Sequence, residues 1–260
     1  MKQKIFLYSI KESFNILRKH KAKVLLLFLL EIAFFVSVSV IGYAYLPKII
    51  TPLGEAEAYI SQINLADKGM QNLLGADPLM IYRSFNNAFY NIKLLLILAT
   101  LAYLITGSIS WYLSVSFVGK ADKRYLAGFF LCAFAFLSIP SFLLYLSLNP
   151  SVLAKGLHGF FLFGLFIVTA YFMFVSFSMA HNLRVNKIKK ALFEVGIKKA
   201  HYIIFACIIV LSAVFSSLEL VYISLEQSLL LVIASVALLI FSIIWGRVFF
   251  ILIINKLSSS

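Results

Sequence analysis

Two charged residues, Glu31 and Arg247, lie well inside long apolar stretches of the chain. Glu31 is seven residues beyond Val24, where one apolar run begins, and Arg247 is nine residues before Lys256. At about 1.5 Å per helical residue, both charges are about 10–13 Å inside their runs. A charge in a bilayer costs about 2.5–3.5 kcal/mol, so it usually faces the bundle interior and pairs there. The sequence therefore predicts an intramembrane ion pair between Glu31 and Arg247.

A second interpretation keeps these two charges apart. Arg247 would then extend its flexible stem to the headgroups, and Glu31 would be protonated or hydrogen-bonded within its own helix. The two interpretations differ in whether substitutions at the two positions have additive effects on stability.

Sequence motifs for catalysis and cofactor binding are absent. The chain contains no Gly-x-x-x-x-Gly-Lys phosphate loop, no His-Glu-x-x-His zinc motif and no Gly-x-Ser-x-Gly nucleophile elbow. The pair Gly107-Ser108 is typical of helix packing rather than of an intramembrane nucleophile. The sequence predicts a protein that is not an enzyme, with no catalytic residue, no metal site and no cofactor.

Composition dictates the elements that hold these residues. The 260 residues are 62% hydrophobic and 13% charged, with a mean hydropathy of +0.99. Soluble domains are about 45–50% apolar and about 25% charged. The content of 26 Phe and 13 Tyr excludes a disordered chain, and two cysteines within apolar runs, Cys132 and Cys207, exclude a disulfide framework. A membrane protein with several spans remains.

Six stretches have the roughly 20 apolar residues that a helix needs to cross a hydrocarbon core about 30 Å thick. They are Val24–Leu46, Ile92–Val118, Tyr125–Leu148, Leu157–Met179, Tyr202–Tyr222 and Ser228–Ile254. These runs are too long for the strands of a barrel. The sequence predicts an all-α polytopic bundle that forms one domain over residues 1–260, with six transmembrane helices arranged as three hairpins.

The distribution of Lys and Arg predicts the orientation of the bundle. Eighteen of the 23 Lys and Arg residues fall on the side of the two termini if six spans alternate. The other five are Lys48, Lys68, Arg83, Lys93 and Lys155. By the positive-inside rule, both termini of this multi-pass protein are expected in the cytoplasm, with the bundle in the cell membrane.

Basic segments lead into the spans on the cytoplasmic side. Within residues 1–23, Ile10, Phe14 and Leu17 repeat at helical spacing, which predicts an amphipathic helix in the headgroup layer. A basic amphipathic segment over 181–201 repeats this pattern. Topology accounts for the formal charge of +13 without nucleic acid, so the expected partners are anionic lipid headgroups. The candidate contacts with lipid or a protein partner are Lys19, Lys21, Lys23, Lys120, Lys123, Arg124, Lys189, Lys190, Lys198 and Lys199.

The largest predicted external segment, residues 48–91, is nearly neutral. Its apolar residues repeat at helical spacing, and Asp77-Pro78 marks a turn before the next span. The helical repeat consists of Leu53, Ala56, Ile60 and Ile63. We expect an external loop with an amphipathic helix lying over the outer membrane surface. Such a helix could serve as a lid, a partner surface or a cap on the bundle.

The lead-in segment Ile10–His20 is followed later in the chain by a similar segment that begins at Ile188. This arrangement resembles that of a known group of membrane proteins. It is similar to uncharacterised six-helix membrane proteins of bacteria and archaea that look like the membrane domain attached to some glycerophosphodiester phosphodiesterases. This resemblance covers the whole layout of the chain. It implies a non-enzymatic scaffold or accessory subunit of a membrane assembly, with another membrane protein as its partner.

The alternative is a permease subunit driven by a separate ATPase. The length and the amphipathic lead-in resemble permeases of ATP-binding-cassette exporters, and Ala191–Gly196 is similar to the coupling loop of importer permeases. Glu194 and Gly196 are closer together than in that loop, and its downstream proline is missing. This resemblance implies a cytoplasmic ATPase that docks at residues 120–124 and 188–199.

Overall fold

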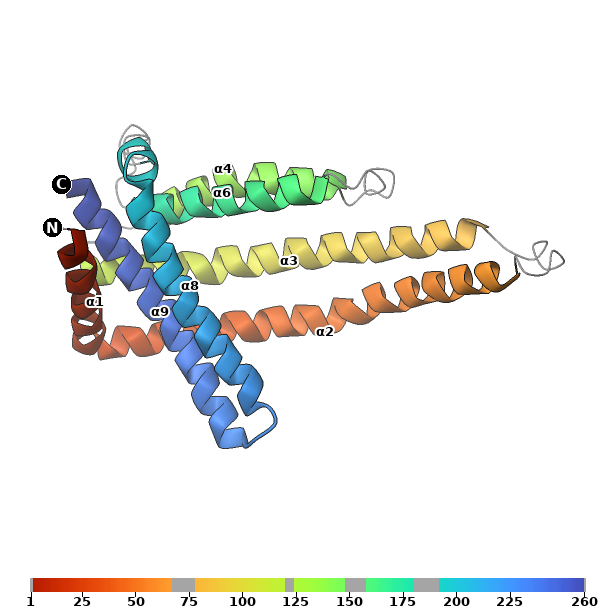
Figure 1. The fold of residues 1–260 in the computed structure, drawn as a ribbon, viewed down its shortest axis with the longest axis horizontal. Helices are drawn as coiled ribbons and strands as arrows, with labels where there is room; N and C mark the ends of the chain where they lie inside the picture. Colours follow the sequence, from red (N-terminus) through yellow and green to blue (C-terminus); the bar gives the residue numbers. More distant parts are fainter. Residues whose placement is uncertain (1, 67–77, 120–123, 148–157, 180–191, 260) are drawn as a thin grey trace. The chain divides into compact units, whose positions relative to one another are not determined.

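A computed structural model describes residues 2–66, 78–119, 124–147, 158–179 and 192–259 of the protein (Figure 1). Within these ranges the chain is helical and contains no strand, which confirms the all-α prediction. The helices are α1 (Lys2–Lys19), α2 (Lys21–Ala66), α3 (Pro78–Val118), α4 (Arg124–Ser147), α6 (His158–Met179), α8 (Ala200–Ser224) and α9 (Leu229–Ser259), with a π-helical turn, η2 (Leu192–Ile197).

Within the described residues, each of the six predicted spans lies on one of these helices. Four stretches are long and apolar enough to cross a membrane: Lys21–Ser61, Leu79–Val118, Ala200–Ser224 and Leu229–Ser258. Where the side chains of α4 and α6 are described, these helices contribute shorter apolar stretches. Several such helices in one chain are expected of a multi-pass membrane protein.

Helices α1 and α2 are almost one helix, with a bend at His20. The His20 N–H donates to the Ile16 carbonyl at 3.1 Å, and the Val24 N–H donates to the His20 carbonyl at 3.0 Å. Figure 1 shows α1 turned across the start of α2. The helix expected over the N-terminal lead-in is therefore present, and its hydrogen bonding continues through the bend into the first predicted span.

By its internal contacts the chain divides into two compact units, and one domain over residues 1–260 stays a prediction. Unit 1 comprises Met1–Phe34, Leu104–Ser138 and Ile167–Ser260. Unit 2 comprises Phe35–Tyr103 and Ile139–Phe166. Helices α2 and α3 contribute to both units because they contain 46 and 41 residues. At the helical rise these lengths are about 69 and 62 Å, roughly twice the thickness of a hydrocarbon core.

The core of unit 1 surrounds the C-terminal half of α9. Every residue from Val248 to Ile254 is buried, as expected for a helix that is apolar on all sides. Helices α1 and α8 both pack against α9. The indole N–H of Trp245 donates to the Ser13 hydroxyl at 2.9 Å, and that hydroxyl donates to the Ile10 carbonyl at 2.7 Å. The last helix is thus held directly by the first.

The apolar face of α1 is largely covered by protein. Leu17 is buried, and Ile10 packs against the core around α9, whereas Phe14 is 47% exposed. The sequence predicts that all three side chains enter the headgroup layer. Packing on α9 takes up most of this face because Ser9 and Ser13 are small and buried, which lets the two helices approach closely.

Unit 2 differs from the expectation of a separate helix over the outer surface. Residues 48–66 continue α2 without a break, even though Pro47 and Pro52 lie within it. Proline at 52 has no N–H for the carbonyl of Lys48, four residues earlier. Instead, the side-chain amide of Asn91 on α3 donates to that carbonyl at 3.4 Å. This contact from α3 gives the freed carbonyl a donor, so α2 continues to Ala66.

The apolar repeat predicted in this segment lies on the continued helix α2. Ala56 is buried, Leu53 is partly buried and Ile60 is exposed. The side chain of Ile63 and the residue Asp77 lie outside the described residues. Helix α3 begins at Pro78, a favourable residue for the first turn of a helix because its missing N–H needs no partner there.

Candidate functional site

Glu31 on α2 and Arg247 on α9 form an ion pair within unit 1. The Arg247 Nη1 atom donates to the Glu31 Oε1 atom at 2.5 Å. The side chains are only 5% and 13% exposed, respectively. The structure therefore brings together the two charges that the sequence singles out, and both lie in the interior of their unit.

Helical periodicity places both charges on buried faces. Leu27 is one turn before Glu31 and is fully buried. On α9, Ile244 and Ile251 lie about one turn on either side of Arg247 and are also fully buried. Residues three or four apart share a face of a helix. The Glu31 carboxylate and the Arg247 guanidinium are therefore directed into apolar surroundings, where they pair with each other.

Trp111 on α3 is a third member of this site that sequence reasoning missed. The guanidinium carbon of Arg247 lies 6.0 Å from the centroid of the Trp111 ring, a distance at which a cation is attracted to the ring face. Trp111 is buried and packs beside Phe174 and Phe177 of α6, with ring centroids 5.8 and 5.6 Å away. Its position inside a span provides a signal, since Trp in membrane helices is usually found at the interfaces.

The site joins α2, α3 and α9 through one ion pair and one ring contact. Two opposite charges in contact neutralise each other, and each offsets the cost of removing the other from water. The nearby serines of α3 are bonded within their own helix: Ser108 donates to the Ile105 carbonyl at 2.8 Å and Ser114 to the Ser110 carbonyl at 2.7 Å. Among the residues that the structure describes, no group of three His, Cys, Asp or Glu side chains could hold a metal ion.

A second polar contact that sequence reasoning missed joins α8 to α9. The hydroxyls of Ser217 and Ser242 are 2.8 Å apart, and those of Ser224 and Ser235 are also 2.8 Å apart. The serines are seven residues apart on each helix, so they lie on one face and meet as two pairs. That spacing is visible in the sequence, but hydropathy alone gives it no weight. Small polar residues at helix contacts stabilise the association of the two helices.

The basic residues proposed to contact lipid or a partner have different environments. Lys19, Lys21, Arg124 and Lys198 are exposed. Lys23 is exposed as well, but its ammonium donates to the Ser116 hydroxyl at 3.3 Å. Four others, Lys120, Lys123, Lys189 and Lys190, lie outside the described residues.

Lys199 has a structural contact at the end of α9. Its ammonium donates to the carbonyl of Leu257 at 2.5 Å, from the residue before the start of α8. A cation at the C-terminal end of a helix is favourable because the last carbonyls have no partner within the helix. This lysine therefore connects the beginning of α8 to the end of α9.

The described part of the basic segment 181–201 is compact rather than a long amphipathic helix. Residues 181–191 lie outside the described residues, and η2 covers Leu192–Ile197 before α8 begins. Val195 and Gly196 are buried, and the Tyr171 hydroxyl donates to the Gly196 carbonyl at 2.6 Å. Only Phe193, Glu194 and Ile197 of this turn are exposed to a potential partner.

Comparison with known proteins gives no relative for this chain: no family model, no curated protein and no solved structure matches it. The resemblance to six-helix membrane domains and the resemblance to transporter permeases both stay predictions.

Proposed function

We propose that the protein is a non-enzymatic integral membrane protein that acts as a scaffold or accessory subunit of a membrane assembly. The observation that carries this proposal is the contact between Glu31 and Arg247. These two charges inside the unit are used to join helices, and the neighbouring hydroxyls of Ser108 and Ser114 are bonded to their own helix. An interior built in this way stabilises a bundle, whereas a channel for hydrophilic solutes would need a continuous polar lining.

The exposed apolar surfaces of the helices favour a partner within the bilayer. Large apolar side chains such as Leu229, Tyr222 and Phe134 are more than three-quarters exposed. Lipid tails can cover these side chains, and so can the apolar helices of another membrane protein. A scaffold needs such surfaces, because in a membrane the partner helices associate through packing and hydrogen bonds.

The proposed topology has six spans, with both termini in the cytoplasm. The helix bundle would lie in the cell membrane. Helices α4 and α6 contain 24 and 22 residues, about 36 and 33 Å at the helical rise, which is enough to cross a hydrocarbon core. The excess of Lys and Arg on the side of the termini supports the orientation.

Reporter fusions test this topology. A green fluorescent protein fused after Ser260 is expected to fluoresce, and alkaline phosphatase fused there is expected to be inactive, because the C-terminus is proposed to be cytoplasmic. The opposite result is expected for the same reporters inserted after Lys68. Phosphatase activity at Ser260 would contradict the orientation, and identical results at the two sites would contradict an odd number of spans between them.

Copurification in a mild detergent tests the scaffold function. We expect the tagged protein to retain another membrane protein at a defined stoichiometry, with no ATPase subunit in the complex. A stoichiometric ATPase would contradict the scaffold proposal and support the permease, which is the second candidate function. Purification of the chain without any protein partner would also count against a scaffold.

A further inference from the structure

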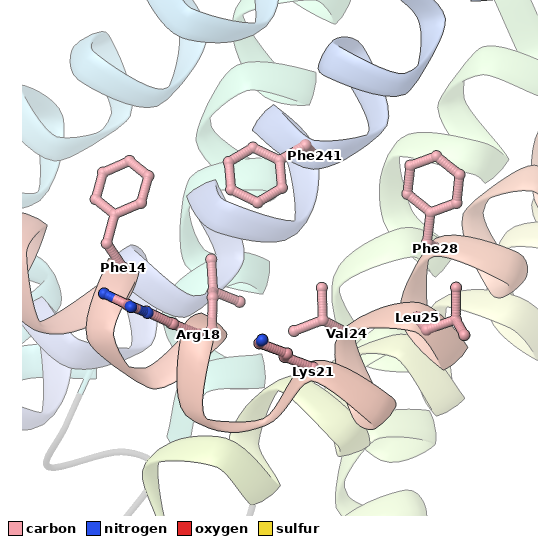
Figure 2. A pocket seen from close by; sticks show the side chains of 8 residues that line it. Phe14, Arg18, Lys21, Val24, Leu25, Phe28 and Phe241 are labelled. Carbon is pink, nitrogen blue, oxygen red and sulfur yellow. The ribbon is translucent and has the colours of Figure 1, made fainter. Parts of the chain in front are cut away.

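An open apolar groove lies between the bend from α1 into α2 and the middle of α9 (Figure 2). Its volume is about 510 Å³, within the range of sites that bind small molecules. All of its lining residues belong to unit 1, and they include Phe14, Arg18, Lys21, Leu25, Phe28 and Phe241.

One side of the groove is a row of aromatic rings. Figure 2 shows the rings of Phe14, Phe241 and Phe28 in line along the groove. The ring centroids of Phe14 and Phe241 are 6.4 Å apart, so the row is continuous between α1 and α9. Phe14 is 47% exposed and Leu25 is 61% exposed. An apolar surface of this kind requires a hydrocarbon cover, which water cannot provide.

The opposite edge of the groove is basic. Figure 2 shows the charged ends of Arg18 and Lys21 on the side away from the row of rings. Both side chains are exposed, and in the part of the chain that the structure describes neither forms an ion pair with a carboxylate. The neighbouring Lys23 is used differently, since its ammonium contacts Ser116 and lies 5.9 Å from the centroid of the Phe117 ring.

We infer that this groove binds one anionic phospholipid. Its phosphate is held between Arg18 and Lys21, and an acyl chain lies along Phe14, Phe241 and Phe28. An arginine guanidinium can bind two phosphate oxygens at once, and the lysine ammonium adds a second positive charge. Basic pockets beside transmembrane helices on the cytoplasmic side are suited to acidic headgroups. The inference rests on the proposed function only in placing α1 at the cytoplasmic leaflet.

Native mass spectrometry of the whole protein in detergent tests this site, with dioleoyl phosphatidylglycerol and dioleoyl phosphatidylcholine as the added lipids. The acyl chains are identical, so any difference reports the headgroup. Two basic residues near a lipid surface contribute about fivefold each to affinity. We expect the first phosphatidylglycerol to bind about 30-fold more tightly than phosphatidylcholine.

The variant Arg18→Gln/Lys21→Gln is expected to remove this preference. The matched control is Lys11→Gln/Lys256→Gln, which removes the same charge from positions of α1 and α9 that do not line the groove. The control is expected to keep the preference. An equal loss in both double variants, or no preference in the unmodified protein, would overturn the site, because the attraction would then be general or absent.

The variant Leu25→Trp tests the apolar part of the groove while keeping both charges. A larger side chain at this exposed position is expected to lower phosphatidylglycerol binding several-fold. Unchanged binding would overturn the placement of the acyl chain. Soluble glycerol phosphate is expected not to displace the lipid, and displacement would point to a site for free phosphate instead. The reporter fusions are independent of these measurements, so the lipid site and the topology can fail separately.

Discussion

Replacing Arg247 with Gln is expected to lower the free energy of unfolding by about 3–5 kcal/mol, because Glu31 then remains as a buried charge without its partner. Replacing Glu31 with Gln is expected to have a similar cost for the same reason. The double variant removes both charges and should be no less stable than either single variant. Unfolding in detergent, followed by tryptophan fluorescence, measures the effect, since Trp111 and Trp245 are both buried in unit 1.

A charge-neutralising change outside the site provides the control. Lys11→Gln removes a positive charge from an exposed position of α1 and is expected to change the free energy of unfolding by less than about 0.5 kcal/mol. Strictly additive effects of Glu31→Gln and Arg247→Gln would mean that the two side chains do not stabilise the fold as a pair. Arg247→Lys is expected to fall between Gln and Arg, because Lys keeps the charge but loses the planar group near Trp111.

Replacing Gly246 with Ala is expected to destabilise the contact between α8 and α9 by about 1–3 kcal/mol. A Cβ atom at this position would be 2.6 Å from the Cγ1 atom of Val210. Valine is β-branched, so its side chain cannot rotate freely out of the way. Thermal unfolding in detergent measures the loss, and adding Val210→Ala to the variant is expected to recover most of it by opening the space.

The same substitution on another helix of the chain is the control. Gly164→Ala on α6 has open space around the new Cβ atom, so it is expected to be neutral or stabilising by up to about 1 kcal/mol through helix propensity. If Val210→Ala did not improve the stability of Gly246→Ala, the predicted clash between the two helices would be wrong. A comparable loss in Gly164→Ala would indicate a general intolerance of the fold to such changes.

The sequence predicted the helices well because hydrophobic runs longer than 20 residues have few alternatives. It also selected Glu31 and Arg247, since an isolated charge in an apolar run has a large and calculable cost. The continuation of α2 to Ala66 was not predictable in this way. Pro47 and Pro52 are ordinary signals for ending a helix, and the donor that compensates for one of them is Asn91 on a different helix.

The contacts of α9 also could not be predicted from the sequence. The seven-residue spacing of Ser235 and Ser242 was present, but hydropathy treats serine only as an interruption. The position of Trp111 beside Arg247 and the closeness of Gly246 to Val210 depend on how near two helices approach. Such distances follow from packing across the whole unit, and a pattern along one helix contains no information about them.

The separation of Glu31 and Arg247 along the chain has a consequence for biogenesis. The two residues are 216 positions apart, in the first and last apolar helices. During synthesis from the N-terminus, Glu31 enters the membrane long before its partner exists. The Glu31 side chain has no Arg247 partner until α9 has been inserted. A chain truncated before that helix therefore keeps Glu31 without this ion pair. Formation of this ion pair therefore reports that α9 has been inserted and packed against α2.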